Sequence, residues 1–449
     1  TGALIRVWRV SGMVKSPKTS MMILFASLVT VMLGFGIVIP LMPFYITHFG
    51  ASGSALGLLM AVYSIMQFIF APLWGRLSDR VGRKPVLLIG VTGYALAFGL
   101  MGFAQSLWML IVARALAGVL SSATLPTAMA YIADITEAKD RSRGVGLMGA
   151  AMGLGMIFGP MLGGLLSGVH LPLPQAIQAG LQTTTDPDTG KLINLSLPFL
   201  FSGLLALLAL PPIHLLLPES LAQARRGQPA AARPGGSRAT QLLGALRGPV
   251  GFLFAMAFLL AFALANLEGV LGLYGKDQFR MGPADIGLLM GALGVLGVIQ
   301  QGLMIGPLTR RFGEAGVLKG GLLISALGFV SMALLRFKWG MVGSVLVYNL
   351  GSSLLTPSVT SMISQQSRPE EQGAAMGINN SFQSLGRSVG PLWAGMAYDI
   401  YPTLSFWTGA IMQFGALLLA LRRLGASAAA ASPSIPALVE DQAQVELGD

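Results

Sequence analysis

Three ionisable side chains lie inside long apolar stretches of the sequence: Glu268, Arg114 and Arg387. Around Glu268 there is no other charged residue from Gly248 to Gly275. Ionised side chains are costly in hydrocarbon, so residues of this kind usually face a wet interior and carry function. A carboxyl group whose surroundings alternate between wet and dry can bind and release a proton. We therefore interpret Glu268 as a proton-binding site; the alternative is a neutral acid that holds two helices together.

The composition indicates an integral membrane protein. Hydrophobic residues make up 54% of the 449 residues, charged residues 10%, and the mean hydropathy is +0.71, whereas a soluble domain carries about 25% charged residues. Apolar runs of about 20 residues favour helices over barrel strands. With no cysteine, three histidines and no metal-ligand spacing, the sequence gives little support for an enzyme, a metal site or a cofactor.

The apolar runs predict twelve transmembrane helices. They fall at 20–46, 55–74, 85–104, 107–132, 144–168, 197–217, 248–274, 285–308, 317–335, 339–365, 374–397 and 402–421. Of the 29 Lys and Arg residues, 22 lie on the side of the termini, five on the opposite side and two within spans. This bias places both termini in the cytoplasm and accounts for the net charge of +11 without nucleic acid.

The two halves of the chain are related by an internal repeat. Three motifs recur at one constant offset: GxxxGP at 155–160 and 386–391, Pro126 and Pro357, and GxLxxRxG at 75–82 and 306–313. Six spans separate the copies, so the halves are parallel repeats about an axis along the membrane normal. Such a repeat places a central site between the halves, near the middle of the membrane.

The chain is predicted to have five parts. They are a cytoplasmic segment (1–19), a six-helix half (20–217), a cytoplasmic linker (218–247), a second six-helix half (248–422) and a cytoplasmic tail (423–449). The linker is rich in Ala, Gly, Pro and Arg and is expected to be flexible. The external segment 169–197 contains the turn sequence DPDTG and is expected to form a small hairpin. The small-residue, acidic tail from 425 onward is expected to be disordered.

Four sequence features resemble the major facilitator superfamily. "GRLSDRVGRKPVLL" (75–88) resembles the loop signature between its spans 2 and 3. "LGFGIVIPLMPFY" (33–45) and "GAAMGLGMIFGPMLGG" (149–164) are similar to the span-1 and span-5 signatures of its twelve-span drug/proton antiporters, and Arg114 matches their basic span-4 residue. The resemblance covers essentially all spans and is nearest in pattern to bacterial multidrug efflux pumps. It implies an all-α major facilitator fold with twelve transmembrane helices in two pseudo-symmetric six-helix halves.

The loop motif is expected to act as a conformational latch formed by Gly75, Asp79, Arg80, Gly82 and Arg83. The two glycines allow tight turns, and Asp79 can sit at a helix N-terminus, where the helix dipole favours an anion. The resemblance implies that this terminus belongs to span 11 and that the contact holds the halves with the outside closed. The basic residues also serve to set the topology.

The span-5 motif comprises Gly155, Gly159 and Pro160. Glycines at four-residue spacing allow helices to pack closely, and Pro160 removes a backbone donor and can bend the helix. A packing seam is sufficient to explain the glycines. The resemblance adds that the seam prevents leakage.

Seven polar residues within the spans are expected to line the substrate cavity: Asn266, Gln67, Gln300, Asn349, Asn379, Gln383 and Arg387. Such groups also serve as contacts between helices. Arg387 could bind an anionic substrate group, pair with Glu268 or contact backbone carbonyls. The resemblance implies that Arg114 takes part in proton coupling and that Glu268 is the glutamate that similar pumps carry in span 7.

The function that these features imply is proton-coupled efflux of lipophilic cationic or neutral drugs by alternating access. The alternatives are export of an amphipathic lipid or siderophore and proton symport of a small organic anion. The expected partners are a small-molecule substrate, protons and the lipid bilayer of the inner membrane, with the protein a monomer that has no cofactor. Similar pumps often carry a second acid in span 10 or an acid in span 1. Both are missing here, which argues against tetracycline exchange and a two-carboxylate mechanism.

Overall fold

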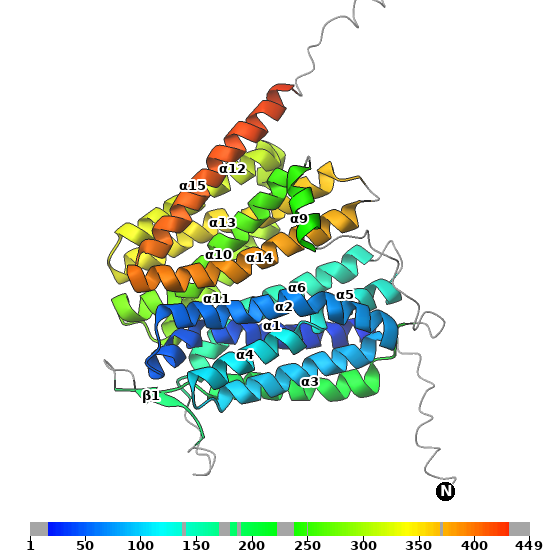
Figure 1. The fold of residues 1–449 in the computed structure, drawn as a ribbon, viewed down its shortest axis with the longest axis vertical. Helices are drawn as coiled ribbons and strands as arrows, with labels where there is room; N and C mark the ends of the chain where they lie inside the picture. The colour runs from blue at the N-terminus through cyan, green and yellow to red at the C-terminus, as the bar shows by residue number, and fades with distance from the viewer. Residues whose placement is uncertain are drawn as a thin grey trace, which may run out of the picture.

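The computed structural model describes residues 17–430 apart from 137–140, 170–179, 186–189, 222–237, 249, 369 and 370. In the first half it contains α1 (Pro17–His48), α2 (Gly53–Val81), α3 (Arg83–Gly102), α4 (Leu107–Ser121), α5 (Thr124–Ile135), α6 (Arg141–Leu166), α8 (Leu197–Pro211) and the π-helix η1 (Pro212–Leu216). In the second half it contains α10 (Gly251–Phe279), α11 (Pro283–Ile299), the π-helix η3 (Gln300–Met304), α12 (Ile305–Leu334), α13 (Lys338–Gln366), α14 (Gln372–Ile400) and α15 (Leu404–Ala430). Figure 1 shows the two sets of helices as neighbouring bundles whose axes run in nearly the same direction.

The helices account for all twelve expected spans. By length and hydropathy alone, nine helical segments in the described part of the chain could each cross a membrane, and one of them is Pro283–Leu334 with 52 residues. That segment divides at Gly313, where φ is +68°. Polar residues lower the hydropathy of α13 and α14, which are the remaining two spans. The helices are therefore consistent with the expected twelve spans in two six-helix halves.

The helices begin and end where the sequence supplies local signals. Ser106 caps α4, because its hydroxyl accepts a hydrogen bond from the Met109 amide at 3.3 Å. Asn194 accepts from the amides of Ser196 and Leu197 at the start of α8. Gly82 separates α2 from α3 with φ of +115°, a conformation that favours glycine. Gly75, by contrast, lies within α2, so the expected turn at that position is wrong.

The external segment forms the expected hairpin. Strands β1 (Thr183–Thr185) and β2 (Leu192–Asn194) pair antiparallel, with Thr184 opposite Ile193. His48 at the end of α1 hydrogen-bonds to Gln182 beside β1. We call this end of the molecule the hairpin side and the opposite end, where α1 begins at Pro17, the terminal side (Figure 1).

Two segments are more ordered than expected. The end of the predicted flexible linker forms α9 (Arg238–Arg247). The last helix, α15, continues to Ala430, beyond the predicted start of the tail at residue 423. Residues 222–237 and 431–449 lie outside the described residues, so the rest of the linker and tail predictions is untested. The proposed division into five parts stays a prediction.

The internal repeat is visible in equivalent packing contacts. In the first half, a Cβ atom placed on Gly159 of α6 would lie 2.8 Å from the Cα atom of Gly36 in α1. In the second half, one placed on Gly390 of α14 would lie 2.8 Å from the carbonyl oxygen of Phe262 in α10. Gly82 and Gly313, which the repeat places at equivalent positions, both have positive φ. Glycine is therefore favoured at the same two places of each half. Close helix packing leaves no room for a side chain at Gly159 and Gly390, and positive φ favours glycine at Gly82 and Gly313.

The repeat offset is one residue shorter on the hairpin side of α11. Gly53 of α2 packs on Gly395 of α14 just as Pro283 of α11 packs on Gly164 of α6. Gly53 and Pro283 are therefore equivalent, although the offset of the sequence motifs would pair Gly53 with the next residue, Ala284. Between Pro283 and the second loop motif the chain forms the π-helix η3. A π-helix accommodates one extra residue within a helix, often at a functional position. The second half has therefore gained one residue in its second span.

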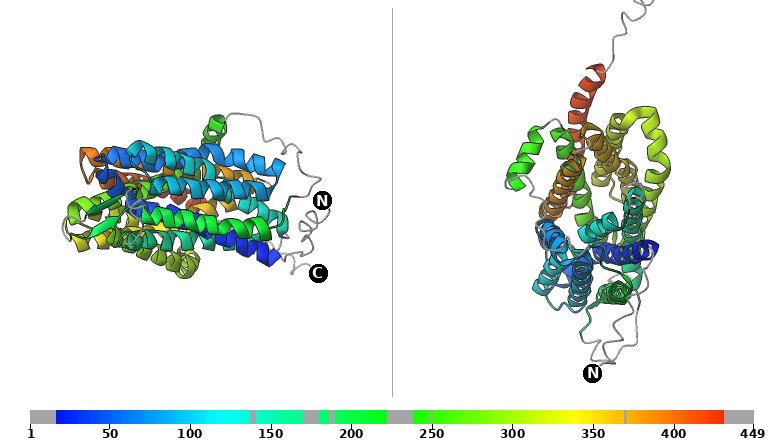
Figure 2. Two further views of the ribbon diagram at one scale, coloured as in Figure 1. Left: turned by 90° about the horizontal axis from the view of Figure 1, so that it is seen from below. Right: turned by 90° about the vertical axis from the view of Figure 1, so that its right-hand side faces the viewer.

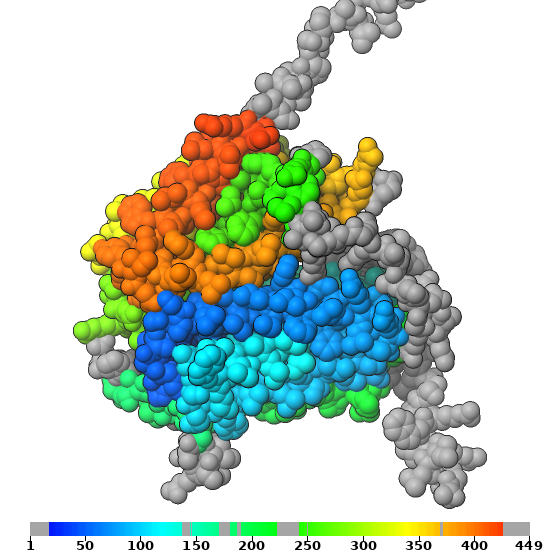
Figure 3. Space-filling model, in the orientation of Figure 1, coloured from blue at the N-terminus to red at the C-terminus, as the bar shows by residue number. Residues whose placement is uncertain are grey.

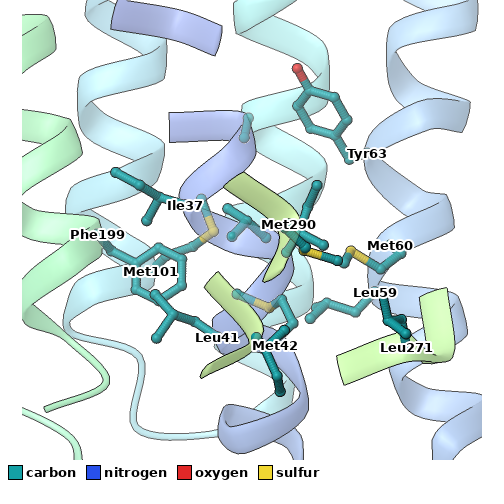
Figure 4. Packing of buried hydrophobic residues seen from close by; sticks show 14 of the residues in the cluster. Ile37, Leu41, Met42, Leu59, Met60, Tyr63, Met101, Phe199, Leu271 and Met290 are labelled. Carbon is teal, nitrogen blue, oxygen red and sulfur yellow. The ribbon is translucent and has the colours of Figure 1, made fainter. Parts of the chain in front are cut away.

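The halves are pressed together on the hairpin side. The amides of Gly53 and Ser54 at the start of α2 donate to Asp399 at the end of α14, at 2.7 and 2.8 Å. In Figure 4, Leu271 of α10 and Met290 of α11 lie among side chains of α1 and α2 such as Met42 and Met60. Figure 3 shows α2 (blue) and α14 (orange) in contact along one face. The structure is closed on the hairpin side.

The terminal side is more open. In Figure 1 the helix ends of the two halves diverge toward the end where the chain begins, and the right-hand view of Figure 2 looks onto that end. At Gly149 of α6 and at Gly297 and Gly302 of the facing span, a Cβ atom would meet no other atom within 4 Å. A second hydrophobic cluster on this side, which includes Leu253, Leu318 and Leu355, belongs to the second half alone. The structure is therefore open toward the terminal side and closed on the hairpin side.

Candidate functional site

A cavity of about 680 Å³ lies between α6 of the first half and the helices of the second half. Its walls are mostly apolar, with polar groups from α10, the π-helix η3, α13, α14 and α15. The polar side chains are Glu268, Gln301, Tyr348, Asn349, Ser352, Ser353, Thr356, Gln383, Arg387 and Gln413. A mostly apolar cavity with a few polar groups is typical of a site for a small organic molecule.

Glu268 and Arg387 face this cavity from α10 and α14. Glu268 is half-buried and Arg387 is exposed to the cavity. Within the described residues, no ion pair of 4.0 Å or less joins the carboxylate to the guanidinium. Glu268 thus lines the cavity wall, whereas its role as a proton-binding site stays a prediction.

Three of the seven residues expected in the cavity wall lie there: Asn349, Gln383 and Arg387. Asn266 points away from Glu268, and its amide donates to the carbonyl oxygen of Ser405 in α15 at 2.9 Å. Gln300 is 5% exposed and hydrogen-bonds to Ser353, while the next residue, Gln301, faces the cavity. Asn266 and Gln300 were therefore wrongly expected in the cavity wall, because their positions around the helix axis direct their side chains toward neighbouring helices.

Gln67 and Asn379 also lie outside the cavity wall. Asn379 is 2% exposed, and its carbonyl oxygen has no hydrogen-bond partner among the described residues. It therefore belongs to the contacts between helices rather than to the site. Gln67 is partly buried on α2, a helix that contributes nothing to the wall.

Several polar residues of the cavity were not expected from the sequence. Ser352, Ser353 and Thr356 follow Asn349 along one face of α13 at the spacing i+3, i+4 and i+7, which is the helical period. This helical spacing can be recognised from the sequence alone. Gln413 of α15 carries no such signal; it is 2% exposed and lines the cavity.

Arg114 lies outside the cavity, buried between α4, α1 and α2. The residue is 1% exposed, and its guanidinium carbon lies 4.6 Å from the ring centroid of Tyr63 and 5.9 Å from that of Phe35. One terminal nitrogen approaches the Met60 sulfur at 3.8 Å. The other two nitrogens, Nε and Nη1, have no hydrogen-bond partner among the described residues. Arg114 is thus a buried cation held by aromatic rings.

The loop motif forms an ion-pair network within the first half. Arg83 contacts Asp79 at 2.5 Å and Asp134 at 3.1 Å. The anion at a helix N-terminus is Glu219, which accepts from the backbone amides of Arg83 and Lys84 at the start of α3. Asp79 does not take the expected place at the start of α14 in this state.

The expected direction of the latch was also wrong. Asp79 at the end of α2 and the start of α14 at Gln372 both lie on the terminal side, where the halves diverge (Figure 1). A contact between them therefore closes the terminal side and cannot hold the hairpin side closed. Arg80 flanks Asp79 in the last turn of α2.

The span-5 motif packs α6 against two helices. Gly155 and Gly159 lie against Met32, Leu33 and Gly36 of α1. A Cβ atom on Gly287 of α11 would lie 3.2 Å from the carbonyl carbon of Pro160. The close packing expected from the glycines is confirmed, and Pro160 lies within α6.

Two repeated helix bundles around a partly polar cavity, closed at one end, define a multi-pass membrane transporter of small molecules. The family model described as the Major Facilitator Superfamily matches residues 24–391, and the chain belongs to this family.

Relatives of this chain are drug-resistance proteins. It is 33% identical to the class C tetracycline resistance protein of Escherichia coli over 393 residues, which cover 86% of this chain and 90% of the relative. It is 30% identical to multidrug resistance protein 2 of Bacillus subtilis over 407 residues, covering 90% and 94%. The quinolone resistance protein NorA of Staphylococcus aureus is 26% identical over 380 residues, covering 84% and 90%.

Solved structures share the fold. A bacterial homologue of the human lysosomal transporter Spinster, inward-facing and occupied, aligns with a TM-score of 0.74 at 14% identity and covers 91% of this chain and 97% of that one. The human organic anion transporter MFSD10 aligns with a TM-score of 0.63 at 23% identity, covering 90% and 100%. At these identities the likeness concerns the fold alone.

Proposed function

We propose that the protein exports lipophilic cationic or neutral drugs in exchange for protons. The observation that carries this proposal is the Glu268 carboxyl group, which lines the cavity without an ion pair among the described residues. A carboxylate in a mostly apolar cavity can hold either a proton or an organic cation, and it releases one when it binds the other. The likeness to multidrug and quinolone resistance proteins supports the same substrates.

In this proposal the terminal side is the cytoplasm and the hairpin side is the exterior, as the distribution of Lys and Arg indicates. The protein would be a monomer in the inner membrane, with both termini in the cytoplasm. The state described here, open toward the terminal side, would then collect substrate from the cell. The test is transport in inverted vesicles with an imposed pH gradient. Uptake of lipophilic cations that stops when the gradient is collapsed supports the proposal, and uptake that ignores the gradient contradicts it.

A second candidate is proton symport of a small organic anion, which the exposed Arg387 in the cavity favours. Arg387→Lys and Arg387→Gln separate it from drug export. If the guanidinium clamps a carboxylate, both variants should lose anion binding by at least about tenfold, because Lys cannot form the bidentate pair. If Arg387 only contacts protein groups, abundance changes while substrate preference stays. The measurement is equilibrium binding of an aromatic carboxylate and of a lipophilic cation to each purified variant.

We propose that Asp79 latches the cytoplasmic side when the transporter opens outward. Its ion pair with Arg83 leaves the side chain 39% exposed in the present state, so it can change partner. A carboxylate at the start of α14 would be stabilised by up to ~2 kcal/mol by the helix dipole. Asp79→Asn is therefore expected to slow transport about tenfold while substrate affinity stays within about threefold. Transport rates equal to those of the parent would exclude the latch.

A further inference from the structure

The cavity is not centred between the halves. Its first-half wall comes almost entirely from α6, and no residue of α2 takes part, although α2 and α6 occupy equivalent boundaries between the halves. The cavity therefore lies beside the boundary where α6 meets α11 and is separated from the boundary where α2 meets α14.

The boundary between α6 and α11 is tight on the hairpin side and opens toward the terminal side. A Cβ atom on Gly294 would lie 3.1 Å from the Ile157 Cα atom, and one on Gly153 would lie 3.9 Å from a Val298 methyl carbon. One turn further, a Cβ atom on Gly149 would meet nothing within 4 Å. We call the opening bounded by Gly149, Gly153, Gly297 and Val298 the lateral gap, and all four residues also line the cavity.

Three of the four equivalent positions on the other boundary carry larger, polar side chains, and the fourth, equivalent to Val298, is Phe68. The offset of the sequence motifs relates Gly149 to Asn380 and Gly153 to Ser384. Gly297 precedes the π-helix, so the offset that is one residue shorter applies and relates it to Gln67. At the lateral gap a hydrocarbon chain would meet only glycines and a valine, whereas at the other boundary it would remove water or hydrogen bonds from three polar groups.

The π-helix lies directly beside the lateral gap. It begins at Gln300, two residues after Val298, and turns Gln301 into the cavity while Ile299 and Leu303 remain exposed at 45% and 70%. The inserted residue thus gives this span one polar group inside and an apolar surface outside. An amphipathic molecule in the gap would meet the same arrangement, with hydrocarbon on the outer side and polar groups such as Glu268 on the cavity side.

We propose that lipophilic substrates enter the cavity sideways from the membrane leaflet on the terminal side, through the lateral gap. The polar head would reach Gln301 and Glu268 while the hydrocarbon tail still lies between α6 and α11. This inference rests on the proposed export function for its substrate class, but the existence of the gap can be tested without any transport.

The chain has no cysteine, so single cysteines can be introduced and labelled directly. We would label Gly297→Cys with bimane in reconstituted vesicles and measure quenching by lipids spin-labelled on the acyl chain. The matched control is Gln67→Cys, the equivalent position on the other boundary. Quenching at 297 is expected to exceed that at 67 at least twofold, because acyl chains enter the gap. Equal quenching at both positions, or none at 297, would overturn the proposal whatever the protein transports.

A second arm separates entry from binding. Gly146→Phe, one turn beyond Gly149 on α6 and outside the cavity wall, should fill the terminal end of the gap. It should slow export of tetradecyltrimethylammonium at least tenfold, while the equilibrium affinity in detergent changes less than threefold. The control is Gly415→Phe on α15, where a Cβ atom also meets nothing within 4 Å and which does not line the cavity. An unchanged export rate, or an affinity that falls as far as the rate, would exclude entry through the gap. If the parent protein exports no such cation, the export proposal fails and the quenching result alone decides.

Discussion

Replacing Glu268 by Gln is expected to reduce proton-driven export to background while the protein folds normally. Gln has the size of the protonated acid, but it neither releases a proton nor attracts a cation. The side chain lines the cavity and is half-buried there, so the substitution removes a charge without opening a void. Export should be measured in inverted vesicles, with protein abundance and thermal stability determined in parallel.

The matched control is Glu314→Gln. Glu314 is a partly buried acid of α12 that hydrogen-bonds to Ser361 and Gln365 and lies outside the cavity. Its replacement is expected to leave proton-driven export within about twofold of the parent. Full proton-driven activity in Glu268→Gln would remove Glu268 from the mechanism.

Charge balance makes this prediction sharper. If one carboxyl group couples the exchange, a monovalent cation leaves as one proton enters, and no net charge crosses the membrane. A membrane potential, worth about 2.3 kcal/mol per charge per 100 mV, should then not drive the exchange. A neutral drug exchanged for one proton moves one charge and should respond to voltage. Strong voltage-driven export of a monovalent cation would require a second proton site.

The fold could be predicted because its causes are local in the sequence. Apolar runs of the right length define the spans, and Gly82 and Gly313 repeat where the backbone must turn with positive φ. The hairpin followed from the turn residues between β1 and β2. The turn expected at Gly75 was wrong, because Gly75 lies within α2 and a Cβ atom there would meet nothing within 4 Å. In a sequence, a single glycine is equally compatible with a turn, a close contact between helices and an uncrowded position on a helix.

The site was harder to predict because it depends on helix rotation. Glu268 and Arg387 stood out by charge alone, since the cost of burying charge does not depend on the partner helix. A neutral amide gives no such signal. Asn266 lies only two residues from Glu268, yet it faces α15, and Gln300 and Gln301 differ in orientation because the π-helix shifts the register. Which polar residues share the cavity therefore follows from packing between helices.

Arg114→Met is expected to stabilise the protein and to abolish transport. The parent residue buries a cation whose Nε and Nη1 atoms have no hydrogen-bond partner among the described residues. A buried unsatisfied donor costs about 1–3 kcal/mol, more when charged, whereas the contact with Tyr63 returns about 2 kcal/mol. Met has a similar length and packs well in apolar surroundings. The unfolding temperature of the purified protein should rise by a few degrees.

A residue that destabilises the fold is expected to serve function. For Arg114 the family resemblance implies a role in proton coupling, which stays a prediction. Arg114→Lys should keep the charge but lose the flat contact with Tyr63, so it should neither stabilise the protein nor restore full exchange. The control is Arg336→Met, an exposed arginine that hydrogen-bonds to Tyr401 on the hairpin side and should change neither quantity much. A fall in unfolding temperature for Arg114→Met with transport retained would mean that Arg114 only supports packing. A rise in unfolding temperature together with loss of proton-driven export would identify it as a buried charge kept for coupling.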